Sequence, residues 1–183
     1  QPALLADVHI DEATWSLASG PRHAEWRQAI AELIEDGSFT LDPDGEPGRR
    51  SDAPKEPPVA LRGRVALAPD AVKLSLFDGR DDEVGRMELQ RPVLAPLLRE
   101  YTHLLTSLDS ALGDMTGSAG DPAPRVEAID IARRLVHDDG AELLRRSCVG
   151  ARPDHKTARR LFTLLVLLTH DTTGRNLASA WPA

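Results

Sequence analysis

Hydrophobic and polar positions follow a clear pattern along most of the chain, and the most apolar run lies near its end. From Leu161 to Leu168 only Thr163 is polar, which is typical of a helix that is buried on most sides. The run is much shorter than the roughly 18 apolar residues that a membrane span requires. The segment Asp154–His170 is therefore predicted to be the central helix of a soluble domain.

Two more helices are predicted before this core helix. Leucines at steps of three and four residues favour a long amphipathic helix over Pro92–Leu112, beginning near Pro96. The pattern of Arg125–Arg146 is also helical, with an interruption or a cap at Gly140. The stretch Gly113–Pro124 between them contains several Gly and Pro residues and is expected to be a flexible connection.

The N-terminal half predicts one helix and several strands. Arg22–Asp36 has the apolar spacing of an amphipathic helix, and Gly37 supplies a stop. Leu4–Ile10 is predicted to be a short strand that could add to the edge of a three-stranded antiparallel meander. The three strands of the meander are expected at Val59–Leu67, Val72–Phe77 and Val84–Leu89.

These elements predict an α+β fold, in which a small antiparallel sheet of three to four strands packs against about four helices. The last helix is expected to be central and buried. Residues 1–170 would form a single domain, interrupted by a mobile loop rich in Pro and Gly at 42–58. The tail 171–183 shows no periodic pattern.

Composition narrows the classes of function. The formal net charge of −7 and an aromatic content of 4% argue against a nucleic-acid partner and against an anionic membrane surface. Cys148 is the only cysteine, so the chain cannot form an internal disulfide, and a cytoplasmic location is expected. The sequence lacks GxSxG, GxxxxGK and GxGxxG, and it therefore predicts no cofactor.

The first turns of the predicted core helix carry an unusual charge. Asp154 is a plausible N-cap, but Lys156, Arg159 and Arg160 follow it. Cations are unfavourable at a helix N-terminus by roughly 0.3 to 1 kcal/mol each. An anionic group is therefore expected near these three side chains.

A second polar cluster lies on the preceding helix. Asp130, Arg133, Arg134 and His137 are three or four residues apart, so their side chains can converge above one surface. The simpler interpretation is a solvated helix face with ion pairs of a few tenths of a kcal/mol. The alternative is a binding site, which would form if the segment Ser147–Pro153 folds the core helix back against its predecessor.

In that second interpretation the two clusters form a cleft for a small anionic ligand of the phosphate or carboxylate type. Four arginines would hold the anion: Arg133, Arg134, Arg159 and Arg160. His137 would donate or accept a proton, and Asp130 would orient His137, as in an acid/base enzyme.

The competing hypothesis is a protein-interaction or structural role without catalysis. The same arginines would then be paired internally with Glu127, Asp130, Asp138 and Glu142, and the two helices could pack across the two-fold axis of a homodimer. A metal site is not predicted, because the sequence contains no HxxxH, HxH or CxxC spacing and four neighbouring arginines would repel a cation.

The segments RVEAIDIARRLVHDDGAELL and HKTARRLFTLLVLLTH together resemble the paired signature of uncharacterised protein family 0262, the UPF0262 family of alphaproteobacteria. The likeness extends more weakly to VHIDEATW, LIEDGSF, VKLSLFDG and REYTHL. It implies no reaction, but it singles out a set of positions, most of them polar: Glu127, Asp130, Arg133, Arg134, His137, Gly140, Thr157, Arg159, Arg160, Phe162, Thr163 and His170.

Overall fold

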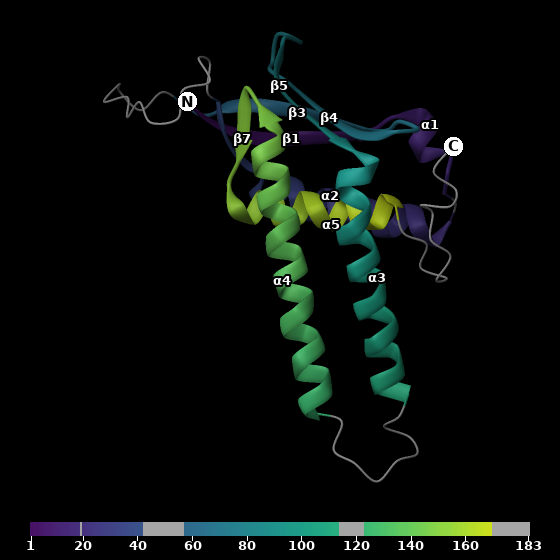
Figure 1. Ribbon diagram of the computed structural model, residues 1–183. Helices are drawn as coiled ribbons and strands as arrows, with labels where there is room; N and C mark the ends of the chain where they lie inside the picture. Colours follow the sequence, from purple (N-terminus) through teal and green to yellow (C-terminus); the bar gives the residue numbers. More distant parts are fainter. Residues whose placement is uncertain (19, 42–56, 114–122, 170–183) are drawn as a thin grey trace.

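The computed structural model describes residues 1–18, 20–41, 57–113 and 123–169 (Figure 1). Most of the Pro-rich loop predicted at 42–58, the tail 171–183 and His170 lie outside these residues. The described strands are β1 (Pro2–Ile10), β2 (Ser38–Leu41), β3 (Val59–Leu67), β4 (Ala71–Phe77), β5 (Glu83–Gln90), β6 (Cys148–Val149) and β7 (Ala151–Pro153). The described helices are α1 (Glu12–Trp15), α2 (Pro21–Asp36), α3 (Arg91–Gly113), α4 (Ala123–Ser147) and α5 (His155–Thr169).

The sheet is larger than the sequence predicts. Its seven strands lie in the order β6-β5-β4-β3-β1-β2-β7, so the prediction of three to four antiparallel strands is wrong. β3, β4 and β5 form the expected antiparallel meander, but β1 pairs with β3 in parallel. The parallel pairing is possible because α1, α2 and β2 lie between the two strands in the sequence and provide the crossover. The strands β2, β6 and β7 have two to four residues each, too few to show a period.

One short segment nearly closes the sheet into a barrel. β6 and β7 lie at opposite ends of the strand order, yet only Gly150 separates them in the chain. Gly150 has φ +78°, and a Cβ there would lie 2.5 Å from the carbonyl oxygen of Val84. A Cβ on Gly85 would lie 2.4 Å from the Cβ of Ala151. Both glycines are therefore needed for β5 to approach this turn.

The predicted core helix is α5, and most of its residues are buried. Its N-cap is Asp154, whose Oδ1 accepts a hydrogen bond of 2.7 Å from the backbone N–H of Thr157. The buried hydroxyl of Thr157 in turn accepts from the N–H of Ser38, at 2.8 Å, where β2 begins. On the other side, the indole N–H of Trp26 donates to the carbonyl of Leu167 at 3.1 Å. These bonds fix α5 against α2 and the sheet.

The long helices α3 and α4 run side by side and extend away from the sheet as a hairpin (Figure 1). α3 begins at Arg91 and contains Pro96, so the predicted start near Pro96 is wrong. α4 runs without a break through Gly140, which is neither an interruption nor a cap. Gly140 is needed instead for close packing, because a Cβ there would lie 2.4 Å from Cδ2 of Phe162 on α5.

None of the helices that the structure describes is long and apolar enough to cross a membrane.

Gly140→Ala is expected to destabilise the protein by about 1–3 kcal/mol, since the new methyl group overlaps the ring of Phe162. Helix propensity alone predicts the opposite sign, a gain of up to about 1 kcal/mol. The free energy of unfolding in urea measures the difference. Gly79→Ala is the matched control, because a Cβ at that glycine meets nothing within 4 Å. A Gly140→Ala protein as stable as the wild type would contradict the packing described here.

Candidate functional site

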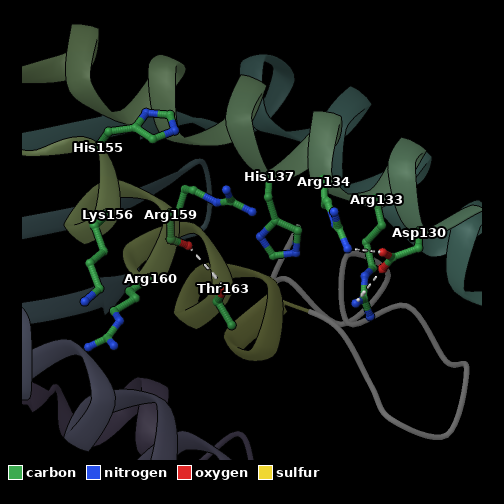
Figure 2. A pocket seen from close by; sticks show the side chains of 9 residues that line it. All are labelled: Asp130, Arg133, Arg134, His137, His155, Lys156, Arg159, Arg160 and Thr163. Atoms are coloured by element: carbon green, nitrogen blue, oxygen red, sulfur yellow. Dashed lines mark hydrogen bonds and ion pairs between the residues drawn. The ribbon is translucent and has the colours of Figure 1, made fainter.

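A cleft of about 700 Å³ lies between α4 and the first turns of α5 (Figure 2). All six residues that the sequence assigned to a site line it. Three further residues complete the lining: His155, Lys156 and Thr163. The two clusters that were predicted separately therefore face one cavity.

Helix geometry explains why these side chains share a cavity. Asp130, Arg133, Arg134 and His137 follow steps of three and four residues along α4, which places them on one face. The same spacing applies on α5, from Lys156 through Arg159 and Arg160 to Thr163. The close approach at Gly140 brings the two faces together.

Each of three carboxylates holds two basic side chains. Asp130 contacts Nη2 of Arg133 at 3.1 Å and Nη2 of Arg134 at 2.6 Å. Asp138 on α4 contacts His155 at 3.0 Å and Arg159 at 3.2 Å, which links the two helices.

The third carboxylate is Asp36, at the end of α2, which contacts Lys156 at 2.7 Å and Arg160 at 2.8 Å. The hydrogen bond from Lys156, together with the charges of Lys156 and Arg160, lowers the pKa of Asp36. These three pairings hold the cations in place.

The cleft still has an excess of positive charge. Its lining contributes four arginines and one lysine, and the three carboxylates balance three of these five charges. The remaining charge is +2 with both histidines neutral. The cleft is therefore positively charged, whereas the whole chain has a formal net charge of −7.

Among the residues that the structure describes, one buried nitrogen of Arg160 has no hydrogen-bond partner. Nη2 of Arg160 contacts Asp36, but Nη1 is buried and donates no hydrogen bond to the described residues. A guanidinium presents five N–H donors, and a buried donor left unpaired costs about 1–3 kcal/mol. The described residues therefore leave part of the hydrogen-bonding capacity of Arg160 unsatisfied.

His137 lies between aromatic rings at the wall of the cleft. Its imidazole makes edge contacts with Tyr101 at 5.3 Å and with Phe162 at 5.5 Å between ring centroids. Burial lowers the pKa of His137, and the charges of Arg159 and Arg133 lower it further, while Asp138 acts in the opposite direction. The ring is therefore mainly neutral at pH 7, a form that can accept a proton.

Asp130 contacts the two arginines and makes no hydrogen bond to His137 within the described part of the chain. The carboxylate whose charge raises the pKa of His137 is Asp138. Glu142, which was expected to neutralise the cluster, contacts Arg145 and Arg146 instead. Asp36 was not foreseen, because it lies 120 residues before Lys156 and no local spacing connects them.

Metal and thiol chemistry find little support here. Among the residues that can be placed, no group of three or more His, Cys, Asp or Glu side chains is arranged to hold a metal ion. Burial raises the pKa of the Cys148 thiol to about 11, so at neutral pH this thiol is protonated and a poor nucleophile.

Comparison with known sequences places this chain in a family. Residues 3–171 match the model of the uncharacterised protein family UPF0262. The chain belongs to UPF0262. No solved structure shows a significant match.

Relatives in the family resemble the chain over nearly its whole length. A UPF0262 protein of Cereibacter sphaeroides strain KD131 is 30% identical over 165 residues, which are 90% of this chain and 96% of the relative. A UPF0262 protein of Novosphingobium aromaticivorans is 33% identical over 171 residues, 90% of this chain and 94% of the relative. A third, from Methylobacterium radiotolerans, is 32% identical over 170 residues, 91% and 93% of the two chains.

Most of the positions that the resemblance singled out in the sequence lie around this cleft. Seven of them line it: Asp130, Arg133, Arg134, His137, Arg159, Arg160 and Thr163. Three more set the positions of the helices. Thr157 bonds α5 to β2, and Gly140 and Phe162 form the close contact between α4 and α5.

The environment of His137 predicts a pH dependence of stability. Because the pKa of the folded state is lower than the ordinary value of 6.5, the unfolded chain binds more protons between the two values. This contribution to stability is fully present above about pH 6.5 and is lost as the pH falls through the pKa of the folded state. Urea unfolding at pH 7.5 and 5.5 should show the loss in the wild type and a smaller loss in His137→Gln. An equal loss of stability in both proteins would contradict the assignment of this pH dependence to His137. His103→Gln, at an exposed site on α3, is the control and should lose as much stability as the wild type.

Proposed function

We propose that this UPF0262 protein binds a small anionic ligand, of the phosphate or carboxylate type, in the cleft between α4 and α5. The observation that supports the proposal most directly is the uncompensated charge: five fixed cations face three carboxylates, and Nη1 of Arg160 is buried without a partner among the described residues. An anion that accepts hydrogen bonds from these guanidiniums would satisfy both the charge and the donor.

The roles of the lining residues follow from their contacts. Arg133, Arg134, Arg159 and Arg160 would hold the anion, since each contact with a carboxylate uses one terminal nitrogen and leaves other N–H groups of the guanidinium for a ligand. Asp130 would position Arg133 and Arg134.

If the site is catalytic, His137 is the residue that would move a proton. Its ring is neutral at pH 7 and stands beside the arginines that would hold the substrate. A bound anion would offset the repulsion from Arg159 and Arg133, so binding would raise the pKa of His137 and favour the protonated form. The acid/base role thus depends on the anion being present.

A small anion fits this site better than a nucleic acid does. The cleft belongs to a chain of net charge −7, and only 4% of the residues are aromatic. Nucleic-acid binding generally uses an extended basic surface that contacts many phosphates, with aromatic platforms for single strands.

Phosphate at ten times its Kd should stabilise the protein by about 1.4 kcal/mol. For a chain of this length the midpoint of thermal unfolding should rise by about 3–6 °C. The shift should be lost in Arg159→Gln and kept in Arg146→Gln, which removes an exposed arginine of α4 that pairs with Glu142 outside the cleft. Sodium chloride at the same ionic strength is the salt control.

Two outcomes would reject the proposal. One is that phosphate, sulfate and acetate give no shift beyond the salt control at 10 mM. The other is that Arg159→Gln and Arg146→Gln respond to phosphate in the same way as the wild type, because the anion would then bind elsewhere.

A homodimer through α4 is the second candidate function, and one observation favours it. Ile131 and Leu135 are 51% and 59% exposed and lie one turn apart on α4, next to Arg134. Two side chains are a small part of the roughly 800 Å² that each partner of a stable dimer buries. The anion site is therefore preferred.

Light scattering during size exclusion separates the two functions. The interaction hypothesis expects a dimer that dissociates when Arg133 and Arg134 are both replaced by Gln, or when Leu135 is replaced by Glu. The anion-binding proposal expects the mass of the protein to be unchanged by Leu135→Glu, and the phosphate shift to survive that substitution.

A further inference from the structure

The cations of the cleft fall into two groups at opposite ends (Figure 2). Arg133 and Arg134 form the first group on α4, and both contact Asp130. Lys156 and Arg160 form the second group at the start of α5, and both contact Asp36 of α2. His137 and Arg159 lie between the groups. We call these groups the α4 end and the α5 end.

The two ends are held independently. Asp130 belongs to the same helix as the arginines that it contacts, at i,i+3 and i,i+4. Asp36 belongs to α2 and joins the α5 end from another element. Because neither carboxylate contacts the cations of the other end, the structure keeps two separate anchoring points rather than one convergent nest.

The middle of the cleft lies between the two ends. Asp138 links α4 to α5 there, through its contact with Arg159. Arg133 and Arg134 lie four to five residues before Asp138, about 6–7.5 Å along the axis of α4, and Lys156 and Arg160 lie on the other side of Arg159 (Figure 2). Each end therefore offers its own position for an anionic group.

We infer that the natural ligand has two anionic groups joined by a linker, one group for each end of the cleft. This inference rests on the proposed function. The volume of about 700 Å³ leaves room for the linker, and the residual charge of +2 matches two singly charged groups. His137 and Arg159 would then face the middle of the ligand, where any proton transfer would occur.

Titration calorimetry at constant ionic strength with orthophosphate and tripolyphosphate, and with acetate and glutarate, tests the inference. The second member of each pair carries an anionic group at both ends of a linker, which in tripolyphosphate is the central phosphate. The two pairs distinguish a phosphate ligand from a carboxylate ligand. In at least one pair the second member should bind at least tenfold more tightly than the first.

Single substitutions at each end test whether the gain in affinity comes from contact with both ends of the cleft or only from the larger charge of the anion. Arg134→Gln at the α4 end and Lys156→Gln at the α5 end should each remove most of the tenfold gain, which is measured as the ratio of the two affinities in the same variant. The matched controls are Arg146→Gln, which like Arg134 lies four residues after its carboxylate on α4, and Lys73→Gln, which removes a lysine paired with Glu88 on the sheet. Both controls should keep the gain.

The outcomes are distinguishable. Equal affinity within both pairs, or a gain that Arg134→Gln and Lys156→Gln leave intact, overturns the inference of two anionic groups and leaves the proposed anion site standing. If none of the four anions binds, the proposed function fails as well.

Discussion

The close contact between α4 and α5 at Gly140 is the constraint on which the site depends. Without a side chain at this position, the ring of Phe162 can lie against the backbone of α4. That approach places His137 beside Phe162 and brings Arg159 within reach of Asp138. A larger residue would move α5 outward, and the polar faces of the two helices would no longer enclose one cavity.

Bringing so many cations together carries an electrostatic cost, and the structure meets it with carboxylates placed at intervals. At an effective dielectric constant near 20, two like charges 4 Å apart repel by about 4 kcal/mol. Asp36, Asp130 and Asp138 each lie between two basic groups. This arrangement lets the cations lie close together. The three carboxylates do not neutralise all five cations, so the cleft keeps a net positive charge.

The sequence predicts the helices and their shared polar faces better than it predicts the sheet. Helical periodicity and local spacing reveal that Asp130, Arg133, Arg134 and His137 share a face, and the cations after Asp154 stand out because they oppose the helix dipole. The size of the sheet could not be predicted, because β2, β6 and β7 are defined by their pairing partners and not by a pattern of their own. Asp36 was missed for the same reason, since its partners are distant in the sequence. Gly140 suggested a break when it in fact permits contact with another helix.

The turn that nearly closes the sheet also connects the two helices that form the cleft. The segment between α4 and α5 is the same one that supplies β6 and β7, which pair with β5 and with β2. Pairing at both edges of the sheet fixes where α4 ends and where α5 begins, and Thr157 adds a bond from the first turn of α5 to β2. The sheet thus helps to place the two helices, together with the contact at Gly140 and the ion pairs of Asp138. A rigid scaffold that holds mutually repelling groups in place is what a preorganised anion site requires.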